Sequence, residues 1–391
     1  MEKERLWAVC FTAEEDIWFV SYWYNLLCKF DISKRELECI PLPVKNIIEG
    51  LYIGILKVGN IICLVPANAD SVCTYNIKTR EFKTFMLRER TKNIDKFIAC
   101  AVYGECVFMF PYHYPYILKF NLETCEAEYL DFRYKGELIQ VGLQSCTCGK
   151  NVYLTVQGSN AIAIYNMQNE TYEYKEIGDK KECYSSVLRT EEDELWMTNQ
   201  RGDIRIYDLR TCKTELIKIG DIKFDVDVQS VSPCFVGNAE YADFVYFFPG
   251  KARMILKVNK KTRQVEKAEF GNTLCQEADN CFGWMGSRFS MPQGKSILYI
   301  FNIINRYFYS INLQSENVEK YEIESSHLNE KELKSLFLQY ETIMQEGYLR
   351  GVYMEKGTRY LGIEHFIKMI ENFPAGDRRQ KENIGEMIFG Q

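Results

Sequence analysis

Histidine is scarce in this chain, which has three histidines among 391 residues. His113 lies in the long N-terminal part, whereas His327 and His365 lie near the C-terminus. A zinc site rich in histidine needs several imidazoles close together, and a Ser-His-Asp or Cys-His arrangement would have to be built on His113. We therefore expect no metal site, no histidine-based catalytic site and no cofactor.

Long apolar runs and basic runs are also lacking. No segment approaches the roughly 18 uninterrupted apolar residues of a membrane-spanning helix, and the N-terminus MEKERLWAVCF does not have the pattern of a secretion signal. The net charge is −6, and the densest basic stretch is Arg378-Arg379 with Lys381. Such a chain does not attract nucleic acid or anionic membranes. We expect no nucleic-acid partner, no membrane insertion and a cytoplasmic location.

The cysteines lack the spacing of a metal site or a redox motif. There are 15 of them, an odd number, and no CxxC pair occurs. In a chain expected to stay in the cytoplasm, they are predicted to be reduced thiols. The closest pair, Cys146 and Cys148, falls at apolar positions of the repeat described next, which indicates buried core thiols.

What the chain does contain is a repeat. An apolar residue followed by Asn or Asp recurs about every 45 residues, and each unit has four strand-like segments. This period is the signature of a β-propeller. We therefore predict an all-β fold, a seven-bladed β-propeller of four-stranded blades over residues 4–324. The seven anchors are Phe30-Asp31, Tyr75-Asn76, Phe120-Asn121, Tyr165-Asn166, Tyr207-Asp208, Val258-Asn259 and Ile311-Asn312.

Other columns of the repeat predict local structure. The Asn or Asp of each anchor, followed in most units by Thr or Ser, predicts a hairpin turn closed by side-chain bonds to the local backbone. Gly59, Gly104 and Gly149 keep one register and predict a second tight turn in their units. A large aromatic on the second strand predicts packing between adjacent sheets; this column contains Trp18, Phe108, Tyr153, Trp196, Tyr246 and Tyr299.

The pattern changes at residue 325. Asn329 and Glu332 form a plausible capping pair, and apolar residues then follow helical spacing. We predict a C-terminal α-helical extension, 325–391, that packs on the propeller, or alternatively on a partner as a dimer interface.

The repeats resemble two known propeller families. Gly202-Asp203-Ile204-Arg205-Ile206-Tyr207-Asp208 resembles the third strand of a WD-repeat blade, and the Phe-Asn-Leu-Glu-Thr segment at Phe120 resembles kelch repeats, although the double glycine of kelch is absent. Residues 363–370 and 384–389 resemble bacterial propeller proteins that accompany cell-surface polysaccharide genes. That resemblance implies a role near sugar chemistry.

The hairpins that join second and third strands contain the candidate binding residues. They are expected on one face of the propeller, where aromatic rings and basic side chains suit a protein partner, a glycan-like ligand or an anionic ligand. The alternative is that the rings only cover neighbouring loops or the tail. The candidates are Tyr22, Trp23, Tyr112, His113, Tyr114, Tyr116, Arg201, Lys251, Arg253 and Arg306.

Two functions stay open at this point. The first is a non-enzymatic binding module. The second is an enzyme that acts on a sugar or peptide in the central channel through carboxylate or tyrosine acid–base groups. The acidic turns Glu14-Glu15-Asp16 and Glu191-Glu192-Asp193-Glu194 join first and second strands, and we expect both to be solvated rather than catalytic.

Overall fold

The computed structural model of the chain describes residues 6, 8–22, 24–44, 50–89, 95–219, 233–250, 252, 254–271, 288–290, 296–302 and 307–323. The predicted helical extension, with His327 and His365, lies outside these residues, and so does its predicted boundary at 324.

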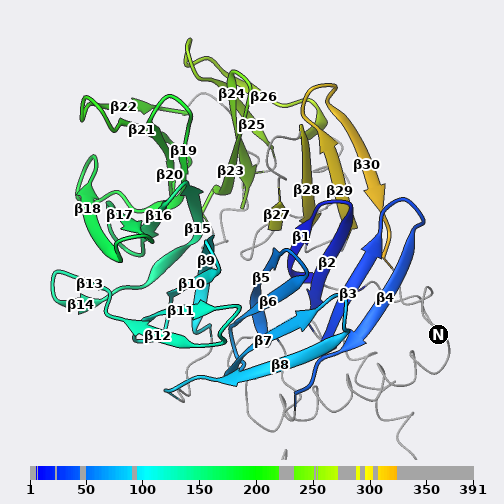
Figure 1. Cartoon of the computed structure of the whole chain (residues 1–391). Coiled ribbons are helices and arrows are strands. Elements are labelled where there is room, and N and C mark those ends of the chain that lie inside the picture. The colour runs from blue at the N-terminus through cyan, green and yellow to red at the C-terminus, as the bar shows by residue number, and fades with distance from the viewer. Residues whose placement is uncertain are drawn as a thin grey trace, which may run out of the picture. The chain divides into compact units, whose positions relative to one another are not determined.

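The described residues form seven four-stranded antiparallel sheets, each built from consecutive strands (Figure 1). The all-β fold and the seven-bladed β-propeller are therefore confirmed. Blade one contains β1 (Ala8–Ala13), β2 (Asp16–Ser21), β3 (Leu26–Asp31) and β4 (Glu36–Pro41). Blade two contains β5 (Tyr52–Val58), β6 (Ile61–Pro66), β7 (Ser71–Asn76) and β8 (Glu81–Met86). Blade three contains β9 (Phe97–Tyr103), β10 (Cys106–Pro111), β11 (Ile117–Asn121) and β12 (Ala127–Leu130).

The remaining blades follow after a short hairpin of β13 (Arg133–Tyr134) and β14 (Glu137–Leu138). Blade four contains β15 (Val141–Cys148), β16 (Asn151–Val156), β17 (Ala161–Asn166) and β18 (Thr171–Glu176). Blade five contains β19 (Tyr184–Arg189), β20 (Glu194–Asn199), β21 (Ile204–Asp208) and β22 (Thr214–Ile217). Blade six contains β23 (Phe235–Tyr241), β24 (Phe244–Pro249), β25 (Leu256–Asn259) and β26 (Val265–Lys267). Blade seven contains β27 (Arg288–Ser290), β28 (Ile297–Asn302), β29 (Tyr307–Asn312) and β30 (Asn317–Tyr321).

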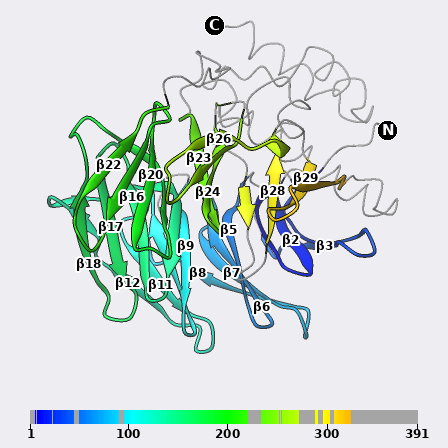
Figure 2. The same ribbon diagram turned by 90° about the horizontal axis from the view of Figure 1, so that it is seen from above.

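The first strand of each blade is the innermost one, and the fourth strand lies at the rim (Figure 1). Figure 2 shows the sheets from the side, with β16–β18 standing beside β20–β22. β1 packs on β5 of the next blade and on β27 of blade seven, so the ring closes between blades seven and one. Among the described strands none is exchanged at this seam; the backbone N–H of Leu6 donates to the carbonyl of Ile323 at 3.2 Å.

The apolar core is divided among the contacts between blades. One cluster lies at each of the seven contacts, and a blade buries both faces of its sheet because it contributes to two of them. The second-strand aromatics lie in these clusters, as predicted. Trp196 is fully buried, with its ring 6.4 Å from that of Phe247 in blade six, and Trp18 lies 6.1 Å from Tyr75 in blade two.

The turn between third and fourth strands has the same geometry in every blade. The Oδ1 atom of each anchor Asn or Asp accepts a hydrogen bond from the backbone N–H three residues later, at 2.9 to 3.2 Å. This prediction is confirmed in all seven blades. The predicted turn glycines Gly59, Gly104 and Gly149 also have positive φ, between 56° and 57°.

Four residues after the Asn or Asp of each anchor the backbone is left-handed, although no glycine occupies this position. The seven residues are Arg35, Arg80, Cys125, Glu170, Cys212, Arg263 and Glu316, with φ from 56° to 62°. In five blades the residue is charged and forms an ion pair with the preceding blade. The pairs are Arg35 with Glu319, Arg80 with Glu38, Glu170 with Lys119, Arg263 with Glu194 and Glu316 with Lys257.

Candidate functional site

The hairpin that joins β2 and β3 contains the first candidate, Tyr22. Its side chain is half-buried and packs against Ile53, Ala67 and Ile98 of blades two and three. Its carbonyl accepts a hydrogen bond from the N–H of Gly50 at 3.0 Å. Tyr22 therefore helps to join blade one to blade two. Trp23, Lys251, Arg253 and Arg306 lie outside the described residues.

The hairpin between β10 and β11 wraps around one backbone carbonyl. The N–H groups of Tyr112, His113 and Tyr114 all donate to the carbonyl oxygen of Lys96, at 2.9, 3.3 and 3.1 Å. The Lys96 side chain is buried, and its Nζ lies 3.2 Å from a carboxylate oxygen of Asp70. These bonds hold the hairpin against the segment that leads into β9.

Tyr114 belongs to the core under this hairpin. Only 2% of it is exposed, and its ring lies 4.8 Å from that of Phe97. The backbone N–H of Glu89 donates to its hydroxyl at 3.1 Å, and burial raises the pKa of Tyr114 to about 12. A buried, neutral phenol of this kind positions the loop rather than meeting a ligand.

Arg88 packs against two tyrosine rings at the surface next to this hairpin. Its guanidinium carbon is 4.9 Å from the ring centre of Tyr116 and 4.6 Å from that of Tyr129. The backbone N–H of Arg88 also donates to the Tyr129 hydroxyl at 2.8 Å. Cation–π contacts to both rings fix the guanidinium, whose Nε also lies 3.6 Å from a carboxylate oxygen of the neighbouring Glu89, while 53% of the Arg88 side chain stays exposed.

Two further rings belong to the hairpin between β10 and β11. Tyr112 and His113 form an edge-to-face pair at 4.3 Å, and both are half-buried. We call these residues the blade-three surface; it consists of Arg88, which follows β8 of blade two, and of Tyr112, His113, Tyr116 and Tyr129 of blade three.

Arg201 lies apart from this patch, in the hairpin between β20 and β21 of blade five. Its side chain is exposed, and its N–H donates to the side-chain oxygen of Asn199 at 2.9 Å. Blade four stands between blades three and five in the ring. The structure therefore brings together Tyr112, His113, Tyr114 and Tyr116 but leaves Arg201 in another blade.

The innermost strands of blades four to six contain a polar cluster. The side chain of Gln144 on β15 donates to the carbonyl of Asn238 on β23 at 3.1 Å, past the intervening blade five. Asn238 is buried and donates to the Ser186 hydroxyl at 3.3 Å, and Ser186 lies 2.7 Å from the Thr198 hydroxyl. The side-chain oxygens of Gln144 and Asn238 are buried without a partner. Neutral amides and hydroxyls of this kind offer hydrogen bonds rather than acid–base chemistry.

The acidic turn at Glu191–Glu194 differs from the prediction, because it is not simply solvated. Lys260 of blade six, with 5% of its side chain exposed, lies 2.7 Å from Glu192 and 2.5 Å from Glu240. Burial raises the pKa of Glu240, and Lys260 opposes this effect. Glu194 pairs with Arg263 and accepts a bond from the Trp196 indole at 3.0 Å. These carboxylates join blade five to blade six.

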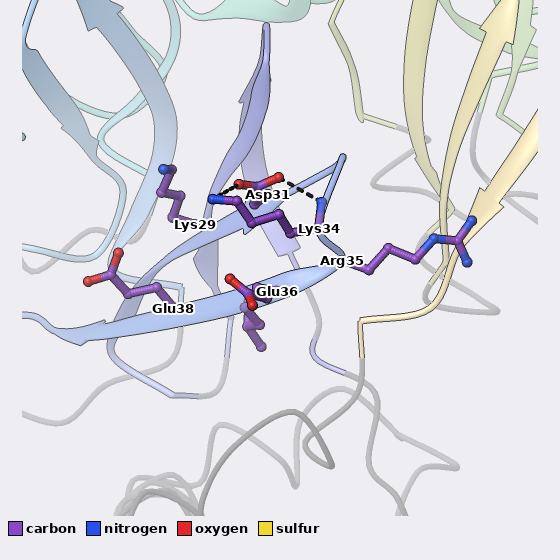
Figure 3. Close-up of a pocket in the computed structure, with 7 residues that line it drawn as sticks. Lys29, Asp31, Lys34, Arg35, Glu36 and Glu38 are labelled. Carbon is purple, nitrogen blue, oxygen red and sulfur yellow. Dashed lines mark hydrogen bonds and ion pairs between the residues drawn. The ribbon is translucent and has the colours of Figure 1, made fainter.

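A recess of about 410 Å³ lies beside the turn between β3 and β4 (Figure 3). Asp31 faces Lys34 there at 3.1 Å, whereas Arg35 points away and pairs with Glu319 of blade seven at 3.2 Å. Hydrogen bonds from Ser33 and Lys34 lower the pKa of Asp31. Charges of both signs line the recess, so it does not favour a ligand of one charge.

The described part of the chain contains neither a cluster of metal ligands nor a membrane-spanning helix. Within it, no group of three or more His, Cys, Asp or Glu side chains could hold a metal ion. Among the same residues, no helix has the length and apolarity needed to cross a bilayer.

No family model matches the chain, and no curated protein matches it. By contrast, 1471 chains of solved structures match, so the fold is widespread. A catalytically inactive variant of virginiamycin B lyase from Staphylococcus aureus, with quinupristin, is 10% identical with a TM-score of 0.56; the match covers 78% of this chain and 96% of that chain. PorZ, a surface component of the type-IX secretion system of Porphyromonas gingivalis, is 7% identical with a TM-score of 0.53; the match covers 82% of this chain and 38% of that chain. A chain of the Mitotic Checkpoint Complex is 7% identical with a TM-score of 0.54, over 80% of this chain and 86% of that chain. At these identities the similarity shows the β-propeller fold alone.

Proposed function

We propose that this chain is a non-enzymatic binding module that recognises a partner protein on its blade-three surface. The propeller fold is consistent with a binding module. The observation that favours this surface is Arg88, which two tyrosine rings hold in place while half of its side chain remains exposed. An ordered guanidinium loses less conformational entropy on binding than a free one.

The composition of the patch supports a protein partner. Tyr and Arg are enriched at protein interfaces, and Trp, Tyr and Arg dominate the residues that contribute most to binding. The half-exposed guanidinium of Arg88 suits a partner segment that carries a carboxylate.

The proposal also includes the hairpins of the other blades. Tyr22 and Trp23 of blade one, with Arg201, Lys251, Arg253 and Arg306 of blades five to seven, would extend the same face. These basic residues would suit an anionic or glycan-like ligand. A dimer through residues 325–391 and a cytoplasmic location belong to the same proposal.

The proposal is tested by capture from an extract of the source cells, followed by binding of the purified partner. Arg88→Glu should abolish capture, because it reverses the charge beside the two tyrosine rings. Lys78→Glu is the matched control. Lys78 is exposed and belongs to blade two, as Arg88 does, but it precedes β8, whereas Arg88 follows that strand. Both variants should unfold at the wild-type urea concentration. Capture that both variants retain would contradict the proposed site, and binding should weaken as salt rises.

A further inference from the structure

We propose that Cys28 and Cys39 form a reversible redox site in the outer hairpin of blade one, where a peroxide oxidises them to a disulfide. Cys28 lies on β3 and Cys39 on β4, and they stand directly opposite one another in the register of the two strands. Their sulfur atoms are 3.6 Å apart. This inference is independent of the proposed partner surface.

The backbone geometry allows the bond. Opposed residues of antiparallel strands have Cα atoms about 4.5 to 5.5 Å apart, within the range of roughly 4.4 to 6.8 Å that disulfides require. The sulfur atoms are already in contact, so a change of side-chain rotamer can bring them within bonding distance. In the described strands, no other two cysteines are paired in register.

The two thiols differ in access to solvent. Cys28 is fully buried, whereas Cys39 is half-buried. Burial, and then the neighbouring Cys39, raise the pKa of the Cys28 thiol. Cys39 is therefore the thiol that a dissolved oxidant reaches first, and Cys28 is the resolving thiol.

The chemistry balances with hydrogen peroxide as the oxidant. The Cys39 sulfur attacks one peroxide oxygen, which gives a sulfenic acid and releases one water. The Cys28 sulfur then attacks the sulfenic sulfur, the sulfur–sulfur bond forms and a second water leaves. The two thiols lose two electrons and two protons in total, and the peroxide accepts them. A thiol reductant reverses the reaction by exchange.

The location gives the bond a structural effect. Both cysteines belong to the apolar cluster between blades seven and one, together with Phe30 and Tyr321. The turn between them contains Asp31 and Arg35, and Arg35 pairs with Glu319 of blade seven. A disulfide would thus close the hairpin that forms one side of the ring seam, and it would restrict opening of this hairpin.

The test treats the whole native chain with hydrogen peroxide and maps the products by mass spectrometry without reduction. Trypsin cleaves after Lys29, Lys34 and Arg35, so the disulfide links the peptide 6–29 to the peptide 36–45. Peptide 6–29 also contains Cys10, so the Cys10→Ala variant is the matched control and should keep the link. Cys28→Ala should abolish the link. Cys39→Ser should abolish it too, and because Cys39 is only half-buried, this variant serves as the test if Cys28→Ala folds poorly.

The result expected is a link that forms in the folded chain, raises its melting temperature and disappears with dithiothreitol. The exposed thiol of Cys212 measures how much peroxide reached the protein. Oxidation of Cys212 without any Cys28–Cys39 link would overturn the proposal. A link that forms only in urea would overturn it as well.

Discussion

Neighbouring blades meet in two regions with different chemistry. Between the sheets they meet through buried apolar and aromatic side chains, such as Trp196 against Phe247. At the rim they meet through charged residues in the turn between third and fourth strands, such as Arg80 with Glu38. Buried area contributes in proportion to the surface removed from water, whereas exposed ion pairs contribute little. The comparison indicates that the sheet contacts stabilise the ring and that the rim pairs help to set its alignment.

High pH should produce the largest effect, because it acts on several interior residues at once. Burial raises the pKa of Tyr114, Tyr246 and Tyr321 to about 12. A folded-state pKa above the unfolded value means that stability is complete below about pH 10 and is lost as the pH rises to about 12. The loss is roughly 2 to 3 kcal/mol for each tyrosine. Urea unfolding followed across this range, with tyrosinate absorbance as the second signal, checks the prediction.

The rim residues give the opposite pH dependence. Hydrogen bonds lower the pKa of Asp31 and Asp208, so their contribution is present above the unfolded pKa and is lost as the pH falls. Both residues are only half-buried and each carboxylate stays charged through local hydrogen bonds at the rim, so this change should be much smaller. A larger loss in acid than in alkali would contradict the comparison.

Trp196→Ala should have the next largest effect. The indole is fully buried between blades five and six, so truncation removes apolar contact and leaves a cavity. We expect a loss of about 3 to 5 kcal/mol in the free energy of unfolding. Equilibrium denaturation by urea measures it, and Trp196→Phe should lose clearly less.

Lys260→Ala tests a residue that is buried like the sheet contacts but forms ion pairs like the rim residues. The lysine is almost fully buried but binds carboxylates of two blades, so its removal leaves Glu240 and Glu192 facing one another without a counter-charge. We expect a loss of about 2 kcal/mol. The adjacent Lys261, 77% exposed, is the control, and Lys261→Ala should be close to neutral. Equal effects for the two lysines, measured by urea denaturation, would show that burial does not decide the strength of these pairs.

Arg80→Ala should have the smallest effect. Its ion pair with Glu38 is exposed on both sides, so the loss in the free energy of unfolding should be close to zero. High salt should remove most of the difference from the wild type, because exposed pairs are screened. A loss that matched Trp196→Ala would reverse the ranking of the two regions.

The features predicted correctly from the sequence are those that act within one repeat. The Asn or Asp of each anchor caps a turn whose partners lie three residues away, so spacing alone identifies it. Trp18 and Trp196 were predicted to pack between sheets, because a large flat ring at one position of each blade requires a neighbouring sheet. The blade count follows from the anchors themselves.

The features missed depend on contacts between repeats. The acidic turn at Glu192 was expected in solvent because its partner, Lys260, is far away in the sequence. Arg88 was overlooked because it lies outside the hairpins, and its two tyrosines come from blade three. One position of the repeat indicates the polar cluster. Thr155 and Thr198 occupy the second-strand position at which other blades have Val20, Val65 and Phe110. Hydroxyl groups therefore replace apolar side chains there in blades four and five.

The seam between blades seven and one has a consequence for how this chain can be rearranged. In a ring closed by strand exchange, one blade contains a strand from each end of the chain. Here each blade consists of consecutive strands, and the seam has the same kind of apolar cluster as the other six contacts. New termini opened between any two blades, with a linker across the present seam, would leave all seven sheets whole. Any of the seven blades could therefore come first in the sequence. The chain could be circularly permuted without changing any hydrogen-bonded strand pair.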